Sequence, residues 1–87
     1  MLIDWRKLNG LPVYTVSGRK LGKISSVIFD IDFNTVFQYE VRTRSIGGRT
    51  FLINPSQIVE WGGNKIVVED GLSKDFAPVN LVESANS

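Results

Sequence analysis

Residues 21–43, "LGKISSVIFDIDFNTVFQYEVRT", decide the fold class, because two strand-like runs flank one short polar turn. In the second run, apolar and polar residues alternate over 36–43, which is the period of a half-buried strand. This alternation predicts that Phe37, Tyr39 and Val41 face a core, while the polar residues between them face solvent.

The first run, residues 21–31, reads as a long strand. Its alternation places Val27, Phe29 and Ile31 on one predicted face. Gly22 stands near the start of this run, where a glycine suggests a bulge or a bend of the kind that barrel strands need.

The turn between the two runs raises the question of metal binding, because Asp30, Asp32 and Asn34 have the D-x-D-x-N spacing that opens a calcium loop. Such a loop also needs a glycine at its sixth position and a glutamate at its twelfth. Counted from Asp30, these positions hold Thr35 and Val41. We therefore predict a β-turn without a metal ion, in which the Asp and Asn side chains bond to their own backbone.

The rest of the sequence adds four short strand-like runs and one helical turn. The runs cover residues 11–16, 49–54, 59–61 and 65–70. The helical turn is predicted to begin after Asp4, a good N-cap, and to end at Gly10. Pro55 has no N–H to donate to a sheet and is predicted to begin a single 3₁₀-like turn. Six short strands without a long helix indicate an antiparallel barrel or sandwich.

Length and composition fit one small globular domain: the chain has 87 residues, of which 43% are hydrophobic and 22% are charged. The net charge of +1 does not by itself indicate nucleic-acid binding. No apolar run reaches the roughly 20 residues of a membrane helix, and the N-terminus lacks a signal-peptide pattern, so we expect a cytoplasmic protein that does not bind a membrane. Because the periodic pattern fades after Gly71, we expect residues 1–71 to form the domain and residues 72–87 to form a loosely ordered tail.

The residue types that carry much of enzyme chemistry are missing, since the chain has no His and no Cys. Catalytic triads and zinc sites built on these residues are therefore excluded. Asp30 and Asp32 lie at a predicted turn, where solvent would keep both carboxylates ionised. The segment "SGRKLG" lacks the spacing and the Lys-Ser/Thr ending of a phosphate-binding loop. We predict a protein that is not an enzyme, needs no cofactor and has no small-molecule substrate.

The order of glycine and apolar residues over residues 8–70 resembles the PRC-barrel family. The matching residues are Gly10, Val13, Gly18, Leu21, Gly22 and Ile24 in the first part, and Leu52, Ile53, Ser56, Ile58, Ile66 and Val67 in the second. The resemblance implies a small antiparallel β-barrel of about six strands, and its motifs are structural rather than catalytic.

The family includes the C-terminal barrel of the ribosome maturation factor RimM, the cytoplasmic barrel of the photosynthetic reaction centre H subunit and small stand-alone proteins, some of them linked to cell division. This chain is similar to the stand-alone members. We therefore expect a non-enzymatic protein-interaction module, an adaptor or scaffold that self-associates as a homodimer through apolar patches and strand edges. The alternative is a ribosome- or RNA-associated maturation factor similar to the barrel of RimM, with RNA or a ribosomal protein as its partner.

Three arginines surround the loop predicted at residues 44–48, and we take Arg42, Arg44 and Arg49 as candidate partner-binding residues. A cluster of this kind can contact RNA or an acidic protein. The competing interpretation is a solvated loop whose charges keep the barrel soluble.

The two tryptophans, Trp5 and Trp61, are candidate anchors, because Trp is enriched at binding hot spots. We take Trp61 as a fourth candidate partner-binding residue. Either side chain could equally fill an end of the barrel. The spacing of Trp61 from Val59 predicts that their side chains share a face.

Ile28, Leu52 and Val67 are candidate self-association residues, because each is apolar and falls on the face opposite the predicted core. A second copy of the chain could cover them. The alternative cover is the predicted tail, whose apolar side chains could fold back over the same face. These tail residues are Leu72, Phe76, Val79 and Leu81.

Overall fold

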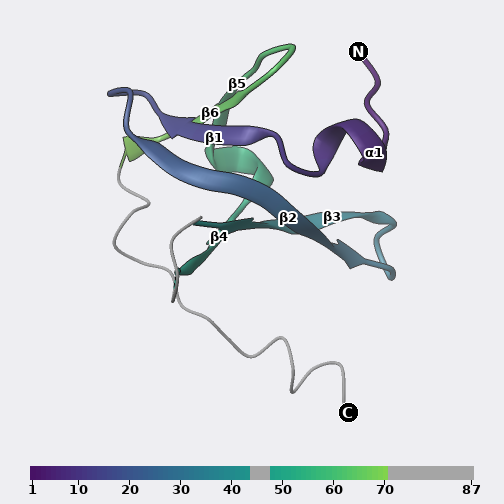
Figure 1. Cartoon of the computed structure of the whole chain (residues 1–87). Helices are drawn as coiled ribbons and strands as arrows, with labels where there is room; N and C mark the ends of the chain where they lie inside the picture. Colours follow the sequence, from purple (N-terminus) through teal and green to yellow (C-terminus); the bar gives the residue numbers. More distant parts are fainter. Residues whose placement is uncertain (44–47, 71–87) are drawn as a thin grey trace.

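The computed structural model describes residues 1–43 and 48–70, which form one short α-helix, one 3₁₀ turn and six strands. In chain order the elements are α1 (Trp5–Leu8), β1 (Pro12–Thr15), β2 (Lys20–Asp30), β3 (Thr35–Arg42), β4 (Thr50–Ile53), η1 (Pro55–Gln57), β5 (Ile58–Trp61) and β6 (Ile66–Val68). The strands form one sheet in the order β4-β3-β2-β1-β6-β5. Figure 1 shows that this sheet bends over on itself, so that β1 and β6 lie across from β3 and β4.

The sheet is mixed. Within the described ranges, β1 and β6 run parallel, with Val13 opposite Ile66 and Thr15 opposite Val68, and the other four pairs are antiparallel. The predicted all-β fold of six strands with a short N-terminal helical turn is confirmed. The structure differs from the predicted antiparallel barrel in the parallel pair and in a ladder that does not close between β4 and β5. Alternation along a strand specifies its faces but not its neighbours, so the sequence could not show either feature.

The core lies inside the fold of the sheet and joins side chains from all parts of it. Its fully buried members are Val13, Val41, Ile53, Ile66 and Val68, which come from β1, β3, β4 and β6. Burying one such side chain contributes about 1.5–3 kcal/mol. Among the described residues, ten buried apolar side chains form this cluster.

α1 closes one end of the core. The Asp4 carboxylate accepts a hydrogen bond from the backbone N–H of Lys7 at 3.2 Å, which confirms the predicted N-cap. Gly10 has a φ of +88°, and its N–H donates to the carbonyl of Ile24 on β2 at 2.8 Å. Leu8 is buried as a result and joins the core.

A β-bulge in β3 overturns part of the predicted alternation. The register pairs Ile28 with Gln38 and Phe29 with Val36, so Phe37 has no residue opposite it on β2. An extra residue of this kind shifts the alternation by one position. Tyr39 and Val41 are buried as predicted, but the prediction that Phe37 faces the core is wrong, because its side chain is 53% exposed. Val36 packs against the core in its place.

A second register shift corrects the prediction for Trp61. On β5, Ile58 lies opposite Val68 and Glu60 opposite Val67, which leaves Val59 without an opposite residue. Val59 is exposed, whereas Trp61 packs against the core, so the two side chains do not share an environment. The spacing of two residues fails here because the bulge interrupts the strand.

Two predicted segments fall on residues that the structure does not describe. These are most of the loop at 44–48, including Arg44, and the tail at 72–87 with its four apolar residues. The 3₁₀ turn predicted at Pro55 is confirmed, and its side chains connect it to the sheet. The Gln57 side chain accepts from the Asn54 N–H at 2.8 Å, and the Gln38 side chain donates to Asn54 at 3.1 Å.

Candidate functional site

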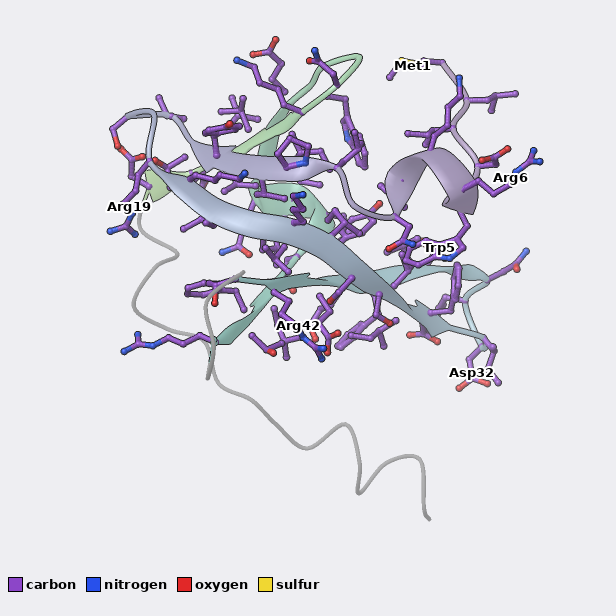
Figure 2. The ribbon with its side chains drawn as sticks, viewed as in Figure 1. Met1, Trp5, Arg6, Arg19, Asp32 and Arg42 are labelled. Atoms are coloured by element: carbon purple, nitrogen blue, oxygen red, sulfur yellow. The ribbon has the colours of Figure 1, made fainter. Side chains whose placement is uncertain are left out.

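A hollow of about 690 Å³, here called the end pocket, opens at the end of the sheet that carries α1 and the β2–β3 turn. The N-terminal segment, α1, β2, β3 and β5 form its wall. The lining residues are Met1, Ile3, Trp5, Leu8, Ser26, Val27, Phe29, Val36, Tyr39 and Trp61. In Figure 2, Trp5 and Asp32 lie at this end of the molecule, and Arg19 lies at the opposite end.

The two bulges supply part of this wall. The shift at Phe37 turns Val36 toward the pocket, and the shift at Val59 leaves Trp61 packed against the core. The rings of Tyr39 and Trp61 meet edge to face, with centroids 5.8 Å apart and planes inclined by 72°. This geometry is favourable for aromatic pairs and fixes the floor of the pocket.

The chemistry of the end pocket is apolar with a few polar atoms. None of the lining side chains is charged. Burial raises the pKa of the Tyr39 hydroxyl, so this group stays protonated and can donate a hydrogen bond. A largely apolar concavity with a few polar groups is the typical form of a binding site. These side chains suit binding through apolar burial and a small number of hydrogen bonds.

Exposed apolar side chains surround the end pocket. On the β2–β3 hairpin they are Phe29, Ile31, Phe33 and Phe37, and in the N-terminal segment they are Met1, Leu2, Ile3 and Trp5. Single exposed apolar residues are normal on protein surfaces, but a contiguous group marks a contact surface. Exposed apolar side chains therefore gather at the end of the sheet that carries the pocket.

Residues 2–73 match the family model of the PRC-barrel domain. The chain belongs to the PRC-barrel domain family. The match confirms the resemblance seen in the order of glycine and apolar residues, and it agrees with the six-stranded, barrel-like sheet. No curated protein matches the chain. PRC-barrel domains are small β-barrel modules that often take part in interactions and are generally non-catalytic.

The structure separates the predicted partner-binding residues of this PRC-barrel domain. Arg42 and Arg49 are exposed near the β3–β4 connection, where Arg42 pairs with Thr50 in the sheet register. The Arg42 guanidinium lies 3.9 Å from the Glu40 carboxylate, and the Arg49 N–H donates to the Thr43 hydroxyl at 2.8 Å. Arg44 lies outside the described residues.

Trp61 lies in the end pocket and Arg42 lines a different hollow, so the structure does not bring these two candidates together. A shared surface of the arginines and Trp61 is therefore not formed within one copy of the described chain. Their roles in partner binding stay predictions.

The predicted self-association residues, Ile28, Leu52 and Val67, are half-buried. They lie on β2, β4 and β6, and no two of these strands are neighbours in the sheet. The structure therefore does not join them in one row, and their role stays a prediction. The apolar side chains of the N-terminal segment and the β2–β3 hairpin are more exposed.

The D-x-D-x-N segment is a turn, as predicted. The Asp30 carboxylate accepts hydrogen bonds from the N–H groups of Asp32 at 3.1 Å and Phe33 at 3.2 Å. Asn34 has a φ of +57°, in the left-handed region that Asn tolerates. Over the described ranges, no group of three or more His, Cys, Asp or Glu side chains could hold a metal ion.

A polar cluster at the opposite end of the PRC-barrel domain has a structural role. The Asp70 carboxylate accepts from the Ser17 N–H at 3.0 Å, and the buried Thr15 hydroxyl lies 3.1 Å from that of Ser17. The hydrogen bond from the Ser17 backbone is the main cause that lowers the pKa of Asp70. The cluster ties Asp70, two residues after β6, to the β1–β2 turn.

Trp5 and Trp61, predicted as candidate anchors from the sequence, both line the end pocket, whereas Phe29 and Val36 were not predicted as pocket residues. One signal could have found this end of the molecule: the turn carries Ile31 and Phe33, where turns normally carry polar residues.

Across the described residues, no helix has the length and apolar character needed to span a bilayer.

Proposed function

We propose that this PRC-barrel domain is a non-enzymatic interaction module, an adaptor or scaffold that binds other polypeptides through the end pocket and the apolar side chains around it. One observation carries the proposal: a hollow of about 690 Å³ with uncharged lining side chains lies at the same end of the sheet as a group of exposed aromatic and aliphatic side chains. Aromatic anchors beside an apolar hollow are typical of hot spots in protein interfaces.

Self-association belongs to this proposal, because a second copy would cover exposed apolar surface. The alternative, a ribosome- or RNA-associated factor, would use Arg42, Arg44 and Arg49. The proximity of Glu40 to Arg42 reduces the positive charge available there for phosphate groups.

The test is a quantitative pull-down from the native cell with three full-length proteins: the wild type, Phe29→Asp and Val16→Asp. Phe29 lines the end pocket and is 64% exposed, whereas Val16 is 60% exposed and does not line it. We expect the wild type and Val16→Asp to retain the same polypeptides and Phe29→Asp to lose them.

Retention of the same polypeptides by all three proteins would contradict the proposal. Salt-sensitive capture of RNA that is lost in Arg42→Ala and unaffected by Phe29→Asp would favour the ribosome-associated alternative instead.

A further inference from the structure

The β2–β3 turn presents two large apolar side chains to solvent. Ile31 is 87% exposed and Phe33 is 78% exposed, on either side of Asp32. Turn positions normally carry small or polar residues, because a turn has water on most sides. Neither side chain lines the end pocket of its own chain. Two exposed apolar side chains at a turn are therefore available to a binding partner.

The turn is held in one conformation before any contact forms. The Asp30 carboxylate accepts two backbone N–H groups of the turn, and Asn34 closes it in the left-handed region. A preformed turn loses less conformational entropy on binding than a mobile one. These hydrogen bonds make the turn a suitable insert for a pocket.

The turn and the end pocket lie at the same end of the molecule, since Phe29 and Val36 line the pocket and are separated from the turn by only one residue on each side. We propose that the occupant of the end pocket is the β2–β3 turn of a second copy, inserted reciprocally about a two-fold axis. This inference rests on the proposed function of the end pocket. A two-fold interface requires a self-complementary surface, and a projecting turn beside a hollow is such a surface.

The size and polarity of the end pocket fit the β2–β3 turn of a second copy. A hollow of about 690 Å³ falls within the range of roughly 300–1,000 Å³ that holds ligands larger than two side chains. Phe33 would enter beside Trp5 and Trp61, where aromatic side chains add edge-to-face contacts to apolar burial.

The charges of the β2–β3 turn and of α1 also fit the insertion of the turn of a second copy. The turn carries the carboxylates of Asp30 and Asp32, while α1, which walls the pocket, carries Arg6 and Lys7. Arg6 is bound to Asp4 at 2.7 Å, and the charge of Lys7 also attracts the Asp4 carboxylate, so α1 with its N-cap keeps one net positive charge. In a reciprocal dimer, each acidic turn would face the basic helix of the other copy, which favours this pairing over contacts between two identical charges.

The first experiment is analytical ultracentrifugation of the full chain from about 10 µM to about 1 mM. We expect the wild type to shift from monomer to dimer in this range and Val16→Asp, at the exposed control position, to do the same. Phe33→Asp should weaken the dimer about tenfold or more, because it places a carboxylate in an apolar hollow. Circular dichroism checks that each variant keeps the sheet.

The second experiment exchanges the charges of residues 7 and 32 between two variants, so that only reciprocal insertion predicts recovery of the dimer on mixing. Asp32→Lys places a lysine opposite Lys7, and Lys7→Glu places a glutamate opposite Asp32, so each variant alone should dimerise more weakly than the wild type. Mixed in equal amounts, the two variants present opposite charges at both contacts, and the mixed dimer should recover. Position 7 lies in both the first and the last turn of the four-residue α1, so circular dichroism checks that Lys7→Glu keeps the fold.

A wild type that stays monomeric throughout, a dimer that survives Phe33→Asp, or weakened variants that do not recover on mixing would each overturn the reciprocal dimer. The proposed function would still stand if, in the pull-down, the Phe29→Asp variant fails to retain a polypeptide other than this chain. The proposed function would be contradicted separately if the variant retains every polypeptide that the wild type retains.

Discussion

At the residue scale, Gly22 is the position where two strands come too close for a side chain. A Cβ atom built on Gly22 would lie 2.4 Å from the Arg42 carbonyl oxygen, and the φ of +152° is one that other residues rarely adopt. Glycine meets both demands because it lacks a side chain. The register shift between Val13 and Tyr14 lies opposite this site, which confirms the bulge predicted from the sequence.

We predict that Gly22→Ala lowers the free energy of unfolding by about 2–3 kcal/mol, since the backbone of β3 must move and the residue must hold a strained φ. The matched control is Gly63→Ala, because nothing lies within 4 Å of a Cβ atom at Gly63. Its effect should stay within about 0.5 kcal/mol. Urea denaturation of both variants provides the comparison, and equal stability would mean that β2 and β3 are not in close contact at Gly22.

Asp70 provides a prediction about pH. Its pKa in the folded state lies below the ordinary value of 3.8, because the Ser17 N–H donates to the carboxylate. The ionised group therefore stabilises the fold above pH 3.8, and this contribution is lost as the pH falls through the lower folded-state pKa. We expect the difference in unfolding free energy between the wild type and Asp70→Asn to shrink between about pH 5 and about pH 2. A difference that stays constant over this interval would contradict the role of the Ser17 hydrogen bond.

At the element scale, the bulge in β3 determines which side chains reach the end pocket. A strand without a bulge would direct Phe37 inward and Val36 outward. The observed register reverses the two, so that Val36 packs against the core and Phe37 is exposed. This reversal opens the space that Trp5 and Trp61 line.

Two neighbouring substitutions test the register of β3. Val36→Asp places a carboxylate against the core, whereas Phe37→Asp places it in solvent. Both carry the cost of Asp in a strand, about 1 kcal/mol. We expect Val36→Asp to be more destabilising by about 2 kcal/mol, the cost of burying a polar group without a partner. Thermal unfolding measures the difference in stability. If Phe37→Asp were the more destabilising variant, the side chains of β3 would alternate without a bulge.

The elements show what the sequence could and could not predict. Local signals succeeded: Asp4 caps α1, Asp30 and Asn34 make the turn, and Tyr39 and Val41 are buried. Alternation failed at Phe37 and Val59, because a bulge depends on how two strands pair and one strand does not reveal it. The parallel contact of β1 with β6 could not be predicted for the same reason.

At the scale of the whole molecule, the two ends of the sheet differ in character. One end is tied together by Asp70 and the β1–β2 turn, and the other carries the end pocket with exposed apolar side chains around it. The pocket could not be predicted from the sequence, because α1, the β2–β3 hairpin and β5 meet there only after folding. We propose that the PRC-barrel domain binds polypeptides at this second end.

Photo-crosslinking in the native cell tests this claim most directly. A photoreactive phenylalanine analogue is placed at Phe29 beside the end pocket or, as the control, at Val16, which has a similar exposed fraction. We expect discrete polypeptide adducts from position 29 and none from position 16. An adduct of twice the chain mass would identify a second copy. Equal adducts from both positions, or adducts from position 16 alone, would contradict the claim.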